Sequence, residues 1–352
     1  MGHRYKGVQW NANKIVYDLY VLGALAAFIG AFMAAGLAPH PTGHAADPVI
    51  LLIRALGTAS FLMLTIILSI GPLARLSPRF LPMLYNRRHL GVVTFLVASA
   101  HFLLALFWYH GSGPLNPLVS IFVSNVPSDP FPGVAFELFG VAAFVILFVM
   151  AATSHDFWLN NLSAPVWKAL HMLAYVAYGL LLMHVAFGAL VTETALLYPA
   201  LAGGSFLAVA ALHVAAGLRE TGRDGGMKRA RAKEGWLDVC APADIPDKRA
   251  VIAPLPQGER VAVFRDGARI FAVSNVCRHQ NGPLGEGRII DGCITCPWHG
   301  WQYRPEDGVS PPPYTEKIAT YDLRLEAGRV LVKTKPNKPG AASRAITLET
   351  AP

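Results

Sequence analysis

The sequence predicts an α-helical membrane bundle of six transmembrane helices followed by a small all-β domain. Of the 352 residues, 53% are hydrophobic and only 15% are charged, whereas a soluble protein usually carries about 25% charged residues. The hydrophobic residues concentrate before residue 219, and short β-type runs separated by Gly, Pro and Asp follow it. This composition excludes a disordered chain and argues against a wholly soluble one.

Six apolar spans account for the helical part of the prediction. They cover residues 15–37, 49–73, 90–109, 133–153, 167–189 and 203–218. Most contain about 20 apolar residues, enough to cross a bilayer at about 1.5 Å per residue. The sixth span is short, and its start is poorly marked. The first span has a longer apolar run than the roughly 7–15 residues of a signal peptide, so we expect it to be retained.

The placement of Lys and Arg predicts the orientation of these spans. Basic residues occupy the N-terminal segment, the loop after the second span and the segment after the sixth, and the loop after the fourth span leads to Lys168. The alternate loops, residues 38–48, 110–132 and 190–202, contain no Lys or Arg. Because cytoplasmic loops are enriched in positive charge, all six spans agree on a topology with both termini in the cytoplasm. This placement also accounts for the net charge of +8 without nucleic-acid binding.

We expect residues 1–218 to form the membrane domain and residues 219–233 to form a basic cytoplasmic linker near the lipid headgroups. Residues 234–336 contain the β-type runs, and residues 337–352 are expected to form a loose tail. The β-type runs are Val261–Phe264, Ile270–Val273, Ile289–Ile290, Tyr321–Leu325 and Val330–Val332.

Two stretches of the β domain each carry one cysteine and one histidine. Cys277 and His279 are followed after sixteen residues by Cys296 and His299, in the pattern C-x-H-x16-C-x2-H. A Rieske [2Fe–2S] cluster needs two Cys ligands on one iron and two His ligands on the other. A zinc site uses the same residue types, but it usually pairs Cys with Cys and His with His at short spacing. The mixed pairs therefore favour the cluster, with these four residues as its ligands.

The segments "CRHQNGPL" and "CPWHGWQY" closely resemble the Rieske ferredoxin family, and the resemblance covers about residues 234–336. High-potential members of that family carry a disulfide and a serine hydroxyl beside the cluster. The corresponding positions here are Gly282, Trp298 and Trp301, whereas Tyr303 matches the family's tyrosine. The resemblance therefore implies fewer hydrogen bonds to the cluster and a potential in the low part of the Rieske range.

The remaining cysteines, Cys240 and Cys293, are expected to be packed strand residues. Cys293 could form a C-x-x-C pair with Cys296, but Cys296 is already required as a ligand. The lack of structural disulfides agrees with a reducing cytoplasmic environment.

Histidines inside the apolar spans predict a second cofactor. His101, His171, His184 and His213 fall within spans, and His89 lies at the cytoplasmic start of the third span. Ionisable residues inside a bilayer are costly and usually mark function. Imidazole is a common axial ligand of haem iron, so the cluster of histidines favours haem.

The segments "GPLARL", "RRHLGVVTFLVASAH" and "WKALHMLAYVAYGLLLMH" resemble the ferric-reductase-like transmembrane family, over about residues 50–190. That family includes the haem b subunit of bacterial methionine sulfoxide reductase systems. The resemblance implies that His101, His171 and His184 are haem ligands. We expect His101 and His184 to share one haem, and His171 could share a second with His89 or His213. The alternatives are an interfacial role for His89 and an interhelical hydrogen bond for His213.

These parts predict a membrane-bound electron-transfer oxidoreductase, in a bacterial inner membrane. Related ferric reductases usually attach a flavin and nicotinamide domain where the Rieske domain stands here. Electrons would pass between a cytoplasmic ferredoxin or flavin reductase, the cluster, haem b and an outer acceptor or quinone. The alternatives are a quinol- or haem-fed donor to a cytoplasmic oxygenase-type partner, and a non-catalytic redox sensor. No second iron site of the oxygenase type follows the Rieske motif, which argues against a terminal oxygenase.

Overall fold

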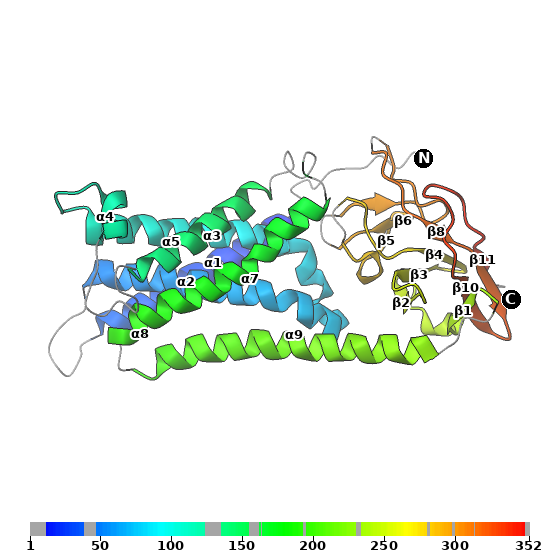
Figure 1. The fold of residues 1–352 in the computed structure, drawn as a ribbon, viewed down its shortest axis with the longest axis horizontal. Coiled ribbons are helices and arrows are strands. Elements are labelled where there is room, and N and C mark those ends of the chain that lie inside the picture. Colours follow the sequence, from blue (N-terminus) through cyan, green and yellow to red (C-terminus); the bar gives the residue numbers. More distant parts are fainter. Residues whose placement is uncertain are drawn as a thin grey trace. The chain divides into compact units, whose positions relative to one another are not determined.

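The computed structural model describes residues 12–38, 47–123, 135–154, 162, 164–192, 195–229, 234–279, 282–297, 300–312 and 314–348. The chain divides into two compact units. One unit comprises Trp10–Leu73 and Asn86–Val214 and is helical, and the other comprises Met1–Gln9, Ala74–Tyr85 and Ala215–Pro352 and contains the strands (Figure 1).

The helical elements agree with the predicted membrane bundle. They are α1 (Ala12–Leu37), α2 (Pro48–Leu76), the 3-10 helix η1 (Pro78–Phe80), α3 (Leu81–His110), α4 (Pro117–Val123), α5 (Glu137–Ala152), α7 (Ala164–Phe187), α8 (Ala189–Thr192) and α9 (Leu197–Arg229). Five segments within the described helices are long and apolar enough to cross a membrane. The predicted fourth span differs, because α5 is an apolar helix of only 16 residues. It is about 24 Å long, somewhat short of a hydrocarbon core of about 30 Å.

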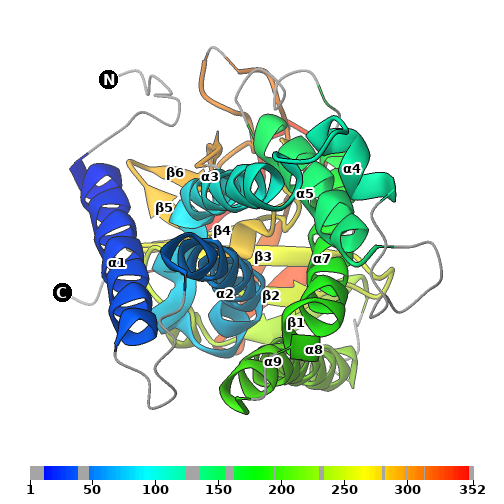
Figure 2. The same ribbon diagram turned by 90° about the vertical axis from the view of Figure 1, so that its left-hand side faces the viewer.

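Contacts within the bundle nevertheless indicate that α5 runs across it like its neighbours. The carbonyl groups of Ile53, near the start of α2, and Phe136, just before α5, contact His101 and His184 respectively. These histidines lie in the C-terminal parts of α3 and α7. The start of α2 therefore lies beside the end of α3, and the start of α5 lies beside the end of α7. In both views α5 lies beside α7, and Figure 2 shows α2 and α3 in the middle with α1 on one side. This arrangement is the alternation expected of consecutive membrane crossings.

The last helix is longer than the sequence predicted. Helix α9 has 33 residues, so it begins before residue 203 and continues through most of the predicted linker. Pro199 lies in its first turn, where a missing backbone N–H is tolerated. The polar residues after Arg219 continue the helix, so the chain is helical as far as Arg229, and residues 230–233 lie outside the described ranges.

The second unit contains a small all-β domain, as predicted, and every strand pairing in it is antiparallel. Its strands are β1 (Trp236–Cys240), β2 (Ala250–Pro254), β3 (Arg260–Asp266), β4 (Arg269–Ser274), β5 (Arg288–Ile290), β6 (Cys293–Thr295), β7 (Gln302–Tyr303), β8 (Thr320–Tyr321), β9 (Leu323–Glu326), β10 (Arg329–Lys333) and β11 (Ile346–Thr347). They form sheets in the orders β1-β10-β9, β11-β4-β3-β2 with β8 on β4, and β5-β6-β7. The first stretch that carries a cysteine and a histidine follows β4 of the second sheet, and the second stretch lies between β6 and β7 of the third sheet.

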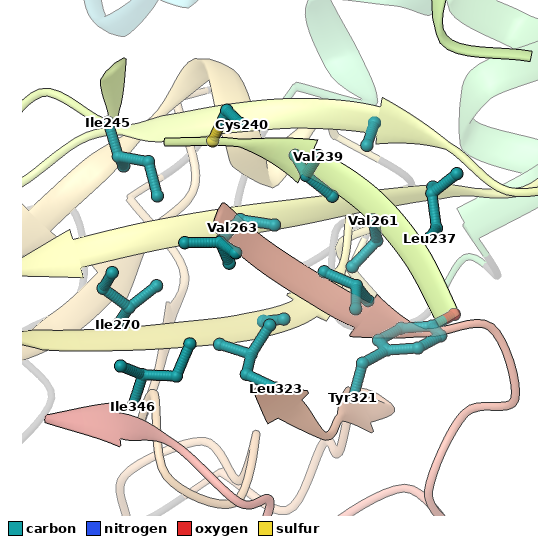
Figure 3. Close-up of a cluster of buried hydrophobic side chains, with 14 of the residues drawn as sticks. Leu237, Val239, Cys240, Ile245, Val261, Val263, Ile270, Tyr321, Leu323 and Ile346 are labelled. Atoms are coloured by element: carbon teal, nitrogen blue, oxygen red, sulfur yellow. The ribbon is translucent and has the colours of Figure 1, made fainter. Parts of the chain in front are cut away.

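The core of the domain corrects the predicted tail. Figure 3 shows Leu237, Val263, Ile270, Leu323 and Ile346 gathered in one apolar cluster between the sheets. Ile346 is 7% exposed and pairs with Ile270 through β11. The prediction of a loose tail from residue 337 is therefore wrong up to residue 348, because β11 covers an otherwise open edge of the core.

Candidate functional site

The first cysteine stretch is a tight loop between β4 and the 3-10 helix η3 (Leu284–Glu286). Cys277 is 1% exposed, and its N–H donates to the carbonyl oxygen of Gly282 at 2.9 Å. Gly285 allows a close approach, since a Cβ there would lie 2.5 Å from the Ile252 side chain. The loop therefore holds a buried sulfur and places His279 two residues further on.

The second cysteine stretch is the turn between β6 and β7. The N–H of Cys296 donates to the carbonyl of Trp301 at 2.7 Å, and Gly300 donates back to Cys296 at 3.0 Å. Gly300 has φ +71°, a conformation that favours glycine. Cys296 is 1% exposed and belongs to the same buried cluster as Cys277. His299, the predicted fourth ligand, and Trp298 lie outside the described residues.

Tyr303 joins the two stretches. Its hydroxyl lies 3.4 Å from Cys277 Sγ and accepts the N–H of Arg278 at 3.0 Å. Burial raises the pKa of the Tyr303 phenol, and the negative charges of the Cys277 and Cys296 thiolates raise it further. The phenol therefore keeps its proton, which can be donated to the Cys277 sulfur.

The donor set fits an iron–sulfur cluster. Two buried thiols, Cys277 and Cys296, belong to one buried cluster of side chains, and the His279 imidazole stacks on Trp301 of the same cluster. Within the described ranges, no three His, Cys, Asp or Glu side chains converge tightly enough to hold a metal without further groups. Two thiolates and one described imidazole match the chemistry of a cluster whose fourth ligand would be His299.

The other two cysteines are packed strand residues, as predicted. Cys240 and Cys293 are buried, and neither forms a disulfide. Burial raises the pKa of each thiol to about 11, so both stay neutral at physiological pH. Neutral, enclosed thiols are poor metal ligands and poor nucleophiles.

The helical unit brings two of its predicted histidines together. The ring centroids of His101 and His184 lie 6.4 Å apart at an interplanar angle of 80°. A metal–imidazole bond is about 2.0–2.1 Å, so a metal between two imidazoles separates the ring centres by about 6 Å. The spacing of the two rings would therefore let both imidazoles bind one metal ion.

The tautomer of both rings follows from their partners. His101 Nδ1 lies 2.9 Å from the Ile53 carbonyl, and His184 Nδ1 lies 3.3 Å from the Phe136 carbonyl. A carbonyl can only accept, so each Nδ1 must carry the proton. The lone pair then sits on Nε2, where a metal can bind, and the carbonyls fix the ring orientation.

Two glycines that the sequence analysis did not single out line this site. A Cβ at Gly57 would lie 2.9 Å from His101 Cε1, and one at Gly140 would lie 2.8 Å from His184 Nδ1. Each glycine thus leaves room for one imidazole. Glycine inside an apolar span was the available signal, but several other helical glycines have no such neighbour.

The remaining membrane histidines have different partners. His171 stacks on Trp167 with centroids 3.7 Å apart, and its Nε2 lies 3.4 Å from Ser154 Oγ. His213 Nδ1 faces the Val209 carbonyl at 2.8 Å, so its Nε2 accepts the Tyr175 hydroxyl at 2.9 Å. His213 therefore makes the interhelical hydrogen bond given as the alternative to haem ligation.

His89 is engaged with a carboxylate. Its Nδ1 lies 3.0 and 3.1 Å from the two carboxylate oxygens of Asp18, on α1. Both side chains are about four-fifths buried or more, at 16% and 15% exposed. The pair ties α1 to α3, at the start of the third predicted span.

Comparisons with known proteins match the helical part and the β domain of the chain to two different families. The family model of the ferric reductase like transmembrane component matches residues 56–182, and that of the Rieske [2Fe-2S] domain matches residues 235–322. The ferredoxin component of the alkene monooxygenase system of Xanthobacter autotrophicus is 33% identical over 102 residues, which cover 29% of this chain and 83% of that protein. The heme-binding subunit MsrQ of the Bordetella pertussis protein-methionine-sulfoxide reductase is 34% identical over 143 residues. These cover 40% of this chain and 63% of MsrQ, so the similarity spans less than two thirds of that relative.

Proposed function

This chain belongs to two families at once, the ferric reductase-like transmembrane proteins through residues 56–182 and the Rieske [2Fe-2S] proteins through residues 235–322, and on that premise we propose its role in the membrane. It is an integral membrane electron-transfer oxidoreductase with a haem domain and a [2Fe–2S] domain. Single electrons pass between a cytoplasmic Rieske domain and haem b in the bundle, towards an outer-side acceptor or a quinone. The observation that carries the proposal is the facing pair His101 and His184 inside the membrane unit.

The haem and the cluster each supply a one-electron redox centre. The bundle contributes two Nε2 atoms, one from His101 and one from His184, and holds their rings through backbone carbonyls. Gly57 and Gly140 leave the space that these rings occupy, which a Cβ at either position would enter. In the β domain, Cys277, Cys296, His279 and His299 are the proposed cluster ligands.

We assign one haem to the pair His101 and His184. His213 and His89 are engaged with Tyr175 and Asp18, and His171 is stacked on Trp167. These contacts favour structural roles for His89 and His213. The haem-ligand roles predicted for His89, His171 and His213 stay predictions, which the haem-to-protein ratio tests.

The proposed orientation places the haem towards the outer side. The basic loops favour cytoplasmic termini. His101 lies nine residues before the end of the segment Asn86–His110, and His184 lies seven before the end of Ala169–Val191. Both segments start in the cytoplasm in this topology, so the facing imidazoles lie in the outer half of the bilayer, on the side of the proposed acceptor.

A second candidate function reverses the flow. The similarity of the Rieske domain to the ferredoxin component of a monooxygenase system favours it. In this version, membrane quinol feeds the haem, and the Rieske domain delivers electrons to a cytoplasmic oxygenase-type partner. The low potential predicted for the cluster opposes that direction, because transfer from quinol would then be uphill.

The test is a dithionite-reduced minus oxidised visible spectrum of the purified full-length protein, with haem and iron quantified and both centres titrated potentiometrically. We expect a b-type band and about three irons per haem, since a [2Fe–2S] cluster adds two irons to that of the haem. A cluster potential below the haem potential supports transfer towards the haem, and the opposite order supports the second candidate. The absence of a haem band would remove the transmembrane electron path.

A further inference from the structure

Trp301 contacts the proposed cluster ligands of both loops. Its indole ring is stacked on the His279 imidazole, with centroids 4.1 Å apart and an interplanar angle of 7°. Its carbonyl accepts the N–H of Cys296 at 2.7 Å. One residue therefore touches a ligand of the first loop through its side chain and a ligand of the second through its main chain.

The indole ring itself is held in place from two directions. Its Nε1–H donates to Ser310 Oγ at 3.0 Å, and Ser310 is 2% exposed. The Tyr314 ring meets it at an interplanar angle of 62°, with centroids 4.2 Å apart. Trp301 is 4% exposed, so the ring can leave the imidazole only by breaking a buried hydrogen bond. Such rigidity is what a group that orients another group requires.

We propose that Trp301, anchored by Ser310, is a positioning residue that fixes the plane of His279 and lowers the reduction potential of the cluster. The proposal rests on the ligand role proposed for His279. The face of an indole ring is negative and attracts positive charge more strongly than the face of a phenyl ring. An imidazole bound to iron is more positive when the iron is oxidised. The stacked indole therefore stabilises the oxidised cluster more than the reduced one.

The argument gives an ordered series of variants. Trp301→Phe keeps an aromatic face but loses the anchor to Ser310, and Trp301→Leu loses the face as well. Ser310→Ala keeps the indole but removes the acceptor that fixes its angle. We expect the cluster potential to rise in Trp301→Phe and to rise further in Trp301→Leu. Ser310→Ala is expected to broaden or shift the cluster's electron paramagnetic resonance (EPR) signal.

The measurements use the full-length protein in detergent: a potentiometric titration and the EPR g-values of the reduced cluster. Trp236→Leu is the matched control. Trp236 lies in β1 and its ring stacks under Arg324, and both residues belong to the sheet β1-β10-β9 rather than to the sheet that carries Cys296. This variant should leave both quantities unchanged. Trp301→Leu could lose the cluster, in which case Trp301→Phe and Ser310→Ala still decide the matter.

Two results would overturn the inference. One is a cluster potential and g-values in Trp301→Phe and Ser310→Ala equal to those of the unmodified protein, with only thermal stability reduced. The other is a fall in potential across the series. Failure of the ligand assignment is a separate outcome, because His279→Ala would then retain the Rieske EPR signal.

Discussion

The imidazole rings of His101 and His184 face each other edge to face across the helical unit, with centroids 6.4 Å apart. Each ring is oriented by a backbone carbonyl from a different helix or helix start, Ile53 for His101 and Phe136 for His184. Four segments of the bundle therefore determine the geometry of one site.

Replacing either ring should remove the haem without harming the Rieske domain. We expect His184→Ala to lose the b-type band in the reduced minus oxidised spectrum, because one of the two imidazoles that would hold the haem is gone. The EPR signal of the cluster should persist. An unchanged haem spectrum in His184→Ala would contradict the assignment.

The reciprocal variant separates the two centres. Cys296→Ser should abolish the [2Fe–2S] signal and leave the haem band. Cys296 is a proposed ligand of the iron–sulfur cluster and lies in the apolar core of the β domain, not in the helical unit. Loss of both centres in each variant would mean that the measurements report unfolding rather than ligation.

Substitution of Gly57 or Gly140 by alanine should disturb haem binding, as substitution of the histidines does. Gly140→Ala would place a Cβ 2.8 Å from His184 Nδ1, the atom that donates to the Phe136 carbonyl. Gly57→Ala would place one 2.9 Å from His101 Cε1. We expect each variant to lower the haem content or shift the b-type band, because the imidazole must move.

Helical glycines with open surroundings give the control for this prediction. A Cβ at Gly179 in α7 or Gly91 in α3 meets nothing within 4 Å. Alanine is favoured over glycine in a helix by roughly 0.5–1 kcal/mol, so propensity alone cannot lower haem content. Equal spectra for Gly140→Ala and Gly179→Ala would show that the imidazole site has room to spare.

These glycines mark the limit of prediction from sequence at the haem site. The span positions and the His101–His184 pairing could be predicted, because apolar runs and intramembrane histidines are local signals. The roles of Gly57 and Gly140 could not, since they depend on which helices face each other. His213 and His89 show the same limit, because their partners Tyr175 and Asp18 lie on other helices.

The partners of His213 and His89 favour one haem per chain. We expect about one haem per chain, and His213→Ala and His89→Ala should keep the b-type band. His213→Ala removes an interhelical hydrogen bond, which is worth about 0.6 kcal/mol on average in a membrane protein. A ratio near two, halved by His171→Ala, would instead restore the predicted second haem.

Tyr303 should affect both the stability of the two cysteine loops and the reduction potential of the cluster. Tyr303→Phe removes the acceptor of the Arg278 N–H and the hydroxyl beside Cys277 Sγ. The Arg278 amide is only partly buried, so the loss of this hydrogen bond costs about 0.5–1.5 kcal/mol. A hydrogen bond to the sulfur stabilises the more negative, reduced cluster, so its loss should lower the potential in a potentiometric titration. A potential that rises or stays constant would exclude donation to the sulfur.

The β domain shows a second limit of the sequence. Its strands were predicted from β-branched runs between turn residues. Four of the five runs lie within single strands, and the run Tyr321–Leu325 is divided at Asp322 between β8 and β9. The stretch from residue 337 was expected to be loose, because the ends of a chain are usually poorly ordered. Its order comes from tertiary contacts: Asn337 Nδ2 donates to Thr320 and Asp322, and β11 pairs with β4. Such contacts leave no local signal.

The C-terminal strand should therefore contribute to stability. Ile346 is 7% exposed within the apolar cluster of the β domain, so Ile346→Ala should lower the free energy of unfolding by about 2 kcal/mol. Thr347→Ala, at an exposed position of the same strand, should change it by less than about 0.5 kcal/mol. Thermal loss of the cluster's visible absorbance in the full-length protein measures both. Equal midpoints for Ile346→Ala and the unmodified chain would mean that β11 adds nothing to the core, and that the Asn337 contacts alone order this segment.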